Sequence, residues 1–304
     1  MTTFIYPGQG SQAVGMGIGV AETYPEALAV FDCASEIAGF DMYELCAHGP
    51  AEKLSQTVYT QPALYTVEAA ITDVLKNHGI IPTFAAGHSL GEFSAWYAAE
   101  VFSFEDGLRL VTERGRIMND ADPGRKGAMA AVIGFTSDEV GDILKDVFGT
   151  IVIANFNSPL QMVISGERSA VDEAGSVLKD KGARRVIPLK VSGAFHSPLM
   201  EDAREEFAAV VDDIALSDAS IPVFCNVSAS PVTDADLIRE IMVKQLTSPV
   251  RWIETVRKLS DKGVEEALEI GPGNTLAGLA KRIDDAFTVK SVPDVDAIME
   301  VIHG

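Results

Sequence analysis

A Gly-x-Ser-x-Gly pattern, Gly87-His88-Ser89-Leu90-Gly91, constrains the fold more than any other part of the sequence. Residues 83–86 before it form a short apolar run typical of a strand, and residues 90–99 after it have helical spacing. Between a strand and a helix, this pattern is typical of a tight turn, where small flanking residues relieve clashes and the serine hydroxyl stands clear of the backbone. The pattern therefore predicts an α/β fold with Ser89 at a sharp strand-to-helix turn.

The rest of the chain alternates strand-like and helix-like segments, and their order changes between residues 127 and 192. The elements expected there are strand 128–133, helix 137–147, strands 151–154 and 161–165, helix 170–181 and strand 185–191. This β-α-β-β-α-β order is typical of a ferredoxin-like unit. We therefore predict an α/β domain of residues 1–126 and 193–304, interrupted by a small α+β subdomain at residues 127–192.

Outside that subdomain, the same patterns predict the other main elements of the α/β domain. Helices are expected at residues 62–77, 104–118, 234–245 and 250–262, and strands at residues 4–6, 223–226 and 266–270. The strand at 266–270 is expected to be the last, followed by Gly271-Pro272-Gly273 and one final helix.

Composition narrows the classes of protein to which this chain can belong. Its 304 residues have a formal net charge of -20, which repels nucleic-acid phosphates at long range. No basic segment leads into an apolar run near the start, and no stretch is long and apolar enough to cross a bilayer. The three cysteines form no Cys-x-x-Cys pair, so neither disulfides nor a metal site is expected. These features predict a cytoplasmic protein that binds neither nucleic acid nor membrane.

One cluster of basic residues stands out in this acidic chain: Lys179, Lys181, Arg184, Arg185 and Lys190. Such a cluster can bind an acidic partner. The alternative is a solvated surface whose charges contact nothing, which is the commoner case.

Ser89 at such a turn is a candidate nucleophile, because the amide of Leu90 at the start of the helix can stabilise developing negative charge. A turn with a purely structural role is the alternative.

A nucleophilic serine needs a base, and the chain has five histidines. His48, His78 and His303 occupy expected loop or helix-end positions, and the side chain of His88 should diverge from its neighbour. His196, at an expected strand-to-helix junction, remains as the candidate base.

Arg114 is an independent signal of a binding site. It falls on the apolar stripe of the helix expected at 104–118 rather than on the polar face. A guanidinium directed inward needs an anionic or polar partner and can grip a carboxylate with two hydrogen bonds. A substrate carboxylate is one candidate. A structural salt bridge, or a side chain that reaches back to water, explains the pattern equally well.

A dinucleotide-binding fingerprint is a competing interpretation of the start of the chain. Gly8-x-Gly10-x-x-Ala13 fits its letters, and Asp32 stands about 20 residues on, where the ribose-binding acid belongs. The fingerprint must open a helix, but three more glycines follow at once, and residues 27–37 have a helical pattern where the second strand should be. We therefore reject a nucleotide-binding oxidoreductase.

Seven motifs, in their order and spacing, resemble the malonyl-CoA:acyl carrier protein transacylase family over nearly the whole chain. The motifs are Pro7-Gly8-Gln9-Gly10-Ser11-Gln12, Gln61-Pro62-Ala63-Leu64, Gly87-His88-Ser89-Leu90-Gly91-Glu92, Arg114-Gly115, Asn155-Phe156-Asn157-Ser158-Pro159, Ala194-Phe195-His196-Ser197 and Gly271-Pro272-Gly273. The resemblance implies an α/β-hydrolase-like core with an inserted ferredoxin-like (βαββαβ) subdomain, which agrees with the predicted order of elements.

The resemblance also implies a role for each matching residue. Ser89 would be the nucleophile, and His196 its general base and later its general acid. Arg114 would bind the malonyl carboxylate, and the backbone amides of Gln9 and Leu90 would form the oxyanion hole.

Four further positions match the family. Gln245 corresponds to the residue whose backbone carbonyl orients the histidine, so that no carboxylate is needed for a triad. His88, Phe195 and Asn157 would line the substrate pocket. The Phe195 position resembles the form found in malonyl-selective members.

The reaction implied is a ping-pong transfer, in which malonyl-CoA acylates the serine and the phosphopantetheine thiol of an acyl carrier protein takes the malonyl group. The partner carries the phosphopantetheine, so neither a cofactor nor a metal is expected, and the chain is expected to act as a monomer. The carrier can serve fatty acid or polyketide synthesis. The alternative function is an acyl hydrolase that clears stalled carrier proteins, although a hydrolase for neutral acyl chains gains nothing from a buried Arg114.

Overall fold

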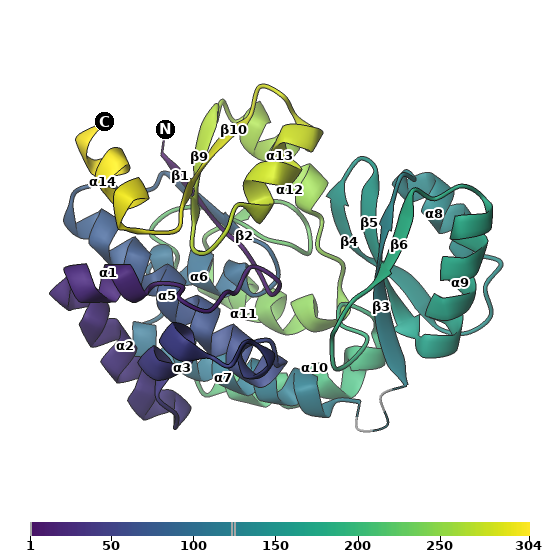
Figure 1. Ribbon diagram of the computed structural model, residues 1–304, viewed down its shortest axis with the longest axis horizontal. Coiled ribbons are helices and arrows are strands. Elements are labelled where there is room, and N and C mark those ends of the chain that lie inside the picture. The colour runs from purple at the N-terminus through teal and green to yellow at the C-terminus, as the bar shows by residue number, and fades with distance from the viewer. Residues whose placement is uncertain (1, 123, 125) are drawn as a thin grey trace.

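The larger body of the protein is built on a six-stranded sheet (Figure 1). The computed structural model describes residues 2–122, 124 and 126–304. The strand order is β10-β9-β1-β2-β7-β8, and all neighbouring pairs are parallel except β7 with β8. These strands are β1 (Thr3–Tyr6), β2 (Phe84–Gly87), β7 (Val223–Phe224), β8 (Pro231–Val232), β9 (Glu266–Ile270) and β10 (Thr288–Val292).

The register of β1 and β2 brings two loops to the same edge of the sheet. Tyr6 pairs with Gly87, so both strands end at the same level. The carbonyl oxygen of Tyr6 also accepts a hydrogen bond of 2.9 Å from the backbone N–H of His88. The carboxyl ends of parallel strands are the usual place for a ligand site in an α/β fold. The loop after β1 and the turn that carries Ser89 therefore emerge side by side.

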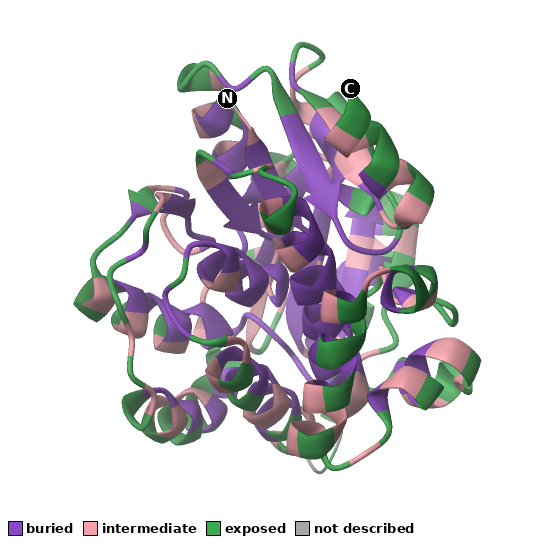
Figure 2. Ribbon diagram, turned by 90° about the vertical axis from the view of Figure 1, so that its left-hand side faces the viewer, coloured by how far each residue is buried: buried purple, intermediate pink, exposed green. Residues whose placement is uncertain are grey.

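Helices cover both faces of this sheet, as a mainly parallel sheet requires. Alternation along β1 places Phe4 and Tyr6 in the large core with α5 (Thr57–Asn77) and α6 (Gly91–Ala98), whereas Ile5 joins a smaller core with α12 (Trp252–Asp261) and α13 (Thr275–Ile283). Figure 2 shows the buried strands and inner helices behind more exposed outer helices. The helices of this body are α1 (Ile18–Thr23), α2 (Pro25–Ala38), α3 (Met42–His48), α4 (Ala51–Leu54), α5 (Thr57–Asn77), α6 (Gly91–Ala98), α7 (Phe104–Asp120), α10 (Glu201–Asp212), α11 (Ala235–Lys244), α12 (Trp252–Asp261), α13 (Thr275–Ile283) and α14 (Val295–His303), with 3-10 turns η1 (Pro198–Met200) and η2 (Gln245–Thr247).

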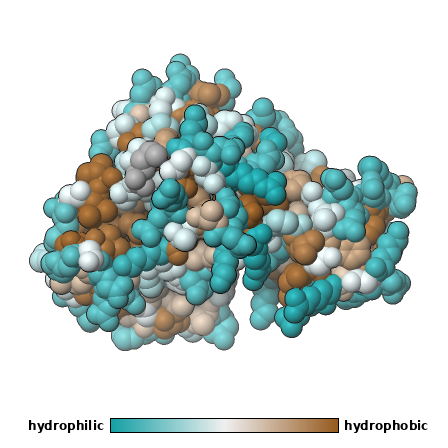
Figure 3. All heavy atoms as spheres, turned by 90° about the horizontal axis from the view of Figure 1, so that it is seen from above, coloured by the Kyte–Doolittle hydropathy of each residue, from teal (hydrophilic) through white to brown (hydrophobic). Residues whose placement is uncertain are grey.

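A second, four-stranded sheet forms a separate lobe beside the larger body (Figure 1). Its elements are β3 (Gly127–Ile133), α8 (Ser137–Leu144), β4 (Ile151–Ser158), β5 (Gln161–Glu167), α9 (Arg168–Asp180) and β6 (Arg185–Pro188). The strand order β4-β5-β3-β6 with antiparallel pairing is that of a ferredoxin-like unit. Seen from above, a notch separates this lobe from the larger body (Figure 3). The predicted fold class is therefore confirmed.

Several predicted boundaries were wrong for physical reasons. Helix α5 begins at Thr57, five residues before Pro62, which it accommodates inside the helix. Strand β4 continues to Ser158 instead of ending at residue 154, because two irregularities in its pairing with β5 carry the polar residues after Ala154 along the sheet edge.

The end of the chain also differs from the prediction, because β9 is not the last strand. β10 adds a further parallel strand beside it, and α14 follows.

The strand predicted at 223–226 is shorter, because only Val223 and Phe224 pair in the sheet. Among the described residues, no helix is both long and apolar enough to span a bilayer.

Candidate active site

Ser89 occupies a turn that only glycine neighbours permit. The turn joins the last residue of β2, Gly87, to the first residue of α6, Gly91, and Ser89 has a left-handed φ of 54°. A Cβ atom on Gly87 would lie 2.0 Å from the carbonyl carbon of Gly91, and one on Gly91 would lie 2.2 Å from the carbonyl oxygen of Tyr6. Both glycines are therefore sterically required, and the strained turn projects the serine from the sheet edge.

Asn226, which follows β7, holds this turn from the neighbouring strand. Its Oδ1 accepts a hydrogen bond of 2.7 Å from the backbone N–H of Ser89, and its Nδ2 donates one of 2.6 Å to the carbonyl oxygen of Gly87. Sequence reasoning missed this residue, because only the pairing of β2 with β7 brings it next to the turn.

His196 faces the serine, as predicted for the base. Its Nε2 lies 2.8 Å from Ser89 Oγ. Its Nδ1 lies 3.0 Å from each of two carbonyl oxygens, those of Gln245 and Ser248. Since carbonyl oxygens only accept, Nδ1 carries the proton and Nε2 is free to accept one from the serine.

The environment keeps His196 neutral. Burial, followed by the nearby charge of Arg114, lowers its pKa to about 3. The ring also makes no ion pair with a carboxylate among the described residues. The pair is thus a Ser-His dyad oriented by backbone carbonyls.

Arg114 is buried beneath the serine, with only 1% of its surface exposed. It lies on α7, and its Nη2 is 3.3 Å from Ser89 Oγ. Nη1 donates to Gln61 Oε1 at 2.8 Å and Nη2 to Gln245 Oε1 at 2.7 Å, while the guanidinium lies 5.2 Å from the centre of the Phe93 ring. Burial lowers its pKa to about 10, which leaves the side chain charged near neutral pH.

Two alternatives for Arg114 are therefore excluded. The side chain does not reach water, and it forms no ion pair with a carboxylate of the described chain. Its neutral amide partners leave a buried positive charge beside the serine, and this arrangement suits an anionic ligand.

A cavity of about 320 Å³ joins these groups. The larger body contributes Gln9, Leu90, Arg114 and the dyad, and the ferredoxin-like lobe contributes residues of β3, β4 and β5. His88, Phe195 and Asn157 also line it, so of the residues predicted for the site only Gln245 lies behind the cavity wall. Within the part of the chain that the structure describes, the amides of Gln9 and Leu90 donate no hydrogen bond to the protein, and they remain available to an oxyanion.

His88 bridges the two lobes rather than acting on Ser89. Its Nε2 lies 2.8 Å from Asn157 Oδ1 of β4, and its ring packs edge-on against Trp252 of α12. Burial lowers the pKa of His88, so the ring is neutral at the cavity wall. The longer β4 is what places Asn157 within reach.

Sequence reasoning missed two more buried residues of the site, Gln61 and Glu92. Gln61 accepts from Arg114, and Glu92 accepts from the backbone N–H of Asn226 at 2.9 Å and from Gln245 Nε2. Both belong to motifs that resemble the family, but only the packing of α5 against α7 gives Gln61 its partner, and only the approach of Asn226 and Gln245 to α6 gives Glu92 its partners.

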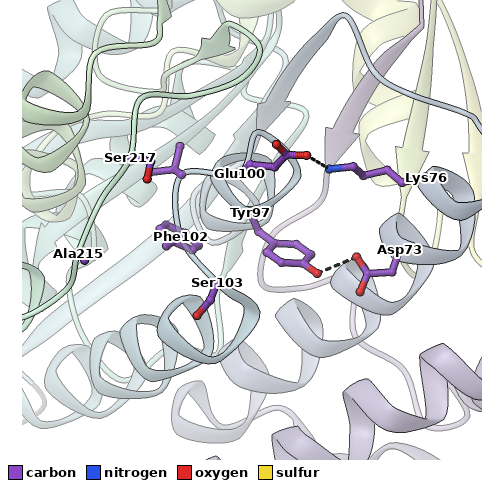
Figure 4. A pocket seen from close by; sticks show the side chains of 9 residues that line it. Asp73, Lys76, Tyr97, Glu100, Phe102, Ser103, Ala215 and Ser217 are labelled. Carbon is purple, nitrogen blue, oxygen red and sulfur yellow. Dashed lines mark hydrogen bonds and ion pairs between the residues drawn. The ribbon is translucent and has the colours of Figure 1, made fainter.

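A second cavity, of about 350 Å³, lies near the end of α6 and the start of α7 (Figure 4). Four of its polar side chains are already paired: Tyr97 donates to Asp73 at 2.7 Å, and Lys76 pairs with Glu100 at 2.7 Å. It contains no pair of nucleophile and base. Nor does the described chain hold a group of three or more histidine, cysteine, aspartate or glutamate side chains arranged for a metal ion.

The dinucleotide fingerprint does not form. The loop after β1 opens no helix before Ile18, and Asp32 lies in α2 rather than at the end of a strand. Its rejection is confirmed, because the loop of Gln9 lines the serine cavity instead.

The α/β sheet, the inserted lobe and the Ser-His pair in the cavity between them define an enzyme of the acyl-transferring class. The model of the acyl transferase domain family matches residues 3–297. The malonyl CoA-acyl carrier protein transacylase of Bacillus subtilis is 43% identical over 298 residues, which cover 97% of this chain and 94% of that protein. The chain belongs to the malonyl-CoA:acyl carrier protein transacylase family, as its motifs predicted.

Solved structures agree with this assignment. An acyl carrier protein S-malonyltransferase from Vibrio cholerae superposes with a TM-score of 0.95 at 41% identity, with 99% of each chain covered. A malonyl-transacylase in complex with a type II PKS acyl-carrier protein gives a TM-score of 0.96 at 39% identity, again over 99% of each chain.

Proposed function

We propose that the chain moves a malonyl group from malonyl-CoA to the phosphopantetheine thiol of an acyl carrier protein through an ester on Ser89. The curated relatives and the solved structures carry the names of this reaction. The observation that supports malonyl most directly is the buried guanidinium of Arg114, 3.3 Å from Ser89 Oγ and without a carboxylate partner in the described chain.

The first half-reaction follows from the geometry of the dyad. His196 Nε2 takes the proton of Ser89 Oγ as the oxygen bonds to the thioester carbon, and the amides of Gln9 and Leu90 stabilise the oxyanion. The carbon-sulfur bond then breaks, and His196 gives the proton to the sulfur of CoA. In the second half, His196 takes the proton of the carrier thiol as the sulfur bonds to the ester carbon. The bond from that carbon to Ser89 Oγ then breaks, and His196 returns the proton to Ser89.

The side chains around the dyad select the acyl group. Arg114 grips the malonyl carboxylate with its guanidinium, and Phe195 beside His196 limits the space for larger acyl groups. His88 and Asn157 contribute a polar wall to the cavity. Held in this way, the malonyl ester is kept for the carrier thiol rather than for water.

The acyl hydrolase alternative uses the same dyad but not the arginine. A neutral acyl chain would lie against the buried guanidinium without forming an ion pair or hydrogen bond with it, which is unfavourable. Arg114 therefore favours the transferase.

Intact-protein mass spectrometry after incubation with malonyl-CoA tests the proposal. The wild type should gain one malonyl group that a phosphopantetheinylated carrier protein then removes, and Ser89→Ala should gain none. No adduct on the wild type, an adduct that persists in Ser89→Ala, or release by water faster than by carrier would each reject the transferase.

The basic cluster of Lys179, Lys181, Arg184, Arg185 and Lys190 supports the proposal that an acidic carrier protein docks on this surface. All five side chains are exposed, and Lys190 lies between Leu189 and Val191, which line the catalytic cavity. Arg185→Glu with Lys190→Glu should raise the KM for the carrier protein without changing the KM for malonyl-CoA. Equal KM values for wild type and variant would favour the solvated-surface interpretation.

We also propose that the enzyme acts as a cytoplasmic monomer without a cofactor. One chain supplies every group that the chemistry needs, and its three cysteines are free thiols, which suits a reducing compartment. Analytical ultracentrifugation tests the monomer, and activity after dialysis against a chelator tests independence from metals. Transfer to fatty acid and polyketide carrier proteins, measured side by side, assigns the pathway.

A further inference from the structure

Glu92 is a buried carboxylate beside the nucleophile that the mechanism above does not use. It belongs to the first turn of α6, and none of its surface is exposed. Its Oε1 accepts a hydrogen bond of 2.9 Å from the backbone N–H of Asn226, and its Oε2 accepts one from Gln245 Nε2. It stands behind the cavity wall, out of reach of a bound acyl group.

Gln245 links Glu92 to the reacting groups. Its Nε2 donates both to Glu92 and to the carbonyl oxygen of Ser89, the latter at 3.1 Å. This orientation leaves Oε1 to accept from Arg114, and the backbone carbonyl of the same residue accepts from His196 Nδ1. If the amide turned over, its NH₂ group would face the guanidinium, so the position of Arg114 depends on how Gln245 is held.

The contacts of Glu92 favour an ionised carboxylate. Both of its oxygens receive an N–H donor, and a carboxylate offers acceptors only. A protonated carboxyl is a weaker acceptor for these two donors, and an amide would direct its NH₂ group at one of them. The negative charge also compensates the buried guanidinium of Arg114, which lacks a direct ion pair among the described residues.

We propose that Glu92 is a positioning residue for malonyl transfer, because its carboxylate holds Gln245, and Gln245 in turn holds both His196 and Arg114. This inference rests on the proposed function, since it assigns Glu92 a part in the acylation of Ser89. A single buried charge thereby sets the geometry of the base and of the carboxylate-binding arginine.

The pH dependence of acylation separates this role from a merely structural one. Burial raises the pKa of Glu92 to about 7, while its hydrogen bonds and Arg114 act in the opposite direction. The ionisable groups that face it are Arg114 of α7 and the Cys225 thiol next to β7. The pKa of His196 is about 3, so the base stays neutral near pH 7, and we expect acylation to slow below neutral pH as Glu92 takes up a proton.

The test compares Glu92→Gln and Glu92→Asp with a matched control, Glu68→Gln. Glu68 is another fully buried glutamate, but it bonds to Ser94 and not to the site. Single-turnover malonylation of Ser89 is followed by intact-protein mass spectrometry at pH values on both sides of 7. Thermal unfolding monitors the fold of each variant.

Glu92→Gln should acylate about 10- to 100-fold more slowly than wild type above neutral pH, because it leaves buried donors unpaired. Its rate should no longer fall as the pH drops through 7, whereas Glu92→Asp should keep such a fall at a shifted pH. Glu68→Gln should keep the wild-type rate and profile.

The inference would be overturned if Glu92→Gln acylated at the wild-type rate and showed the wild-type fall in rate at acid pH (the acid limb of the pH profile). If Glu92→Gln does not fold, an acid limb in Glu92→Asp at the wild-type pH would overturn it equally. Failure of the proposed function is distinguishable, because the wild-type protein itself would then take no malonyl group.

Discussion

Replacement of Arg114 by alanine tests the link between the buried guanidinium and the choice of acyl group. In the wild type, the guanidinium lies 3.3 Å from Ser89 Oγ and has only neutral protein partners, the amide oxygens of Gln61 and Gln245. A malonyl carboxylate in the cavity can therefore form a buried, charge-assisted pair with it. Acetyl-CoA has no carboxylate and cannot form this pair.

The size of the effect follows from the burial of the pair. Removing one partner of a buried, hydrogen-bonded charge pair costs about 2–5 kcal/mol, or about 30- to several thousandfold in kcat/KM. We expect that loss for malonyl-CoA with Arg114→Ala. Acetyl-CoA should be used as well as before or better, since its methyl group no longer faces a buried charge. The kcat/KM of Arg114→Lys for malonyl-CoA should lie between the values for wild type and Arg114→Ala, because lysine keeps the charge but not the planar guanidinium group.

The assay is the ratio of kcat/KM for malonyl-CoA to that for acetyl-CoA. Lost packing against Phe93 affects both substrates and cancels in this ratio. Arg116→Ala, on the same helix but half exposed and paired with Glu113 and Glu206, is the matched control and should leave the ratio unchanged. Equal losses for the two substrates in Arg114→Ala would refute the reasoning.

Three further predictions concern two supports of the site and one buried carboxyl apart from it. Gly91→Ala places a methyl group 2.2 Å from the Tyr6 carbonyl oxygen. It should lower the free energy of unfolding, measured by urea titration, by about 1–3 kcal/mol and abolish acylation. A stable, active variant would contradict the steric argument. Asn226→Ala leaves the Ser89 N–H unpaired and should slow malonyl and acetyl transfer alike, and a change confined to malonyl would be inconsistent with its role. Burial raises the folded-state pKa of Glu68 well above 4.5, so the stability due to its neutral form is complete below pH 4.5 and is lost as the pH rises toward that pKa. Glu68→Gln cannot ionise, so its unfolding free energy relative to wild type should rise by up to about 1.4 kcal/mol per pH unit between pH 4.5 and the folded-state pKa of Glu68. A difference independent of pH would disprove the buried-carboxyl argument.

Local rules explain which parts of the fold the sequence predicted. A strand followed by two flanking glycines and a helix leaves the backbone little choice at Ser89. The order of elements in the inserted lobe follows from periodicity, because hydrophobic spacing changes between strands and helices. The misplaced boundaries lie where tertiary packing overrides local preference: Pro62 is accommodated within α5, and Asn157 continues an edge strand.

The same division applies to the site. The sequence alone determined that Ser89 sits on a turn and that Arg114 points inward, since one follows from neighbouring residues and the other from helical spacing. It left open what Arg114 binds. Elimination among the five histidines indicated His196, and the family motifs indicated the backbone carbonyl of Gln245, both without their geometry.

Only the tertiary structure decided how these groups are held. Asn226 reaches Ser89 because β7 pairs with β2, and Glu92 reaches Arg114 only through the side chain of Gln245, more than 150 residues away along the chain. Such contacts depend on which elements become neighbours after folding, and no local pattern in one sequence encodes that. For this protein the sequence determined which groups react, and the packing of distant elements determined the geometry in which they react.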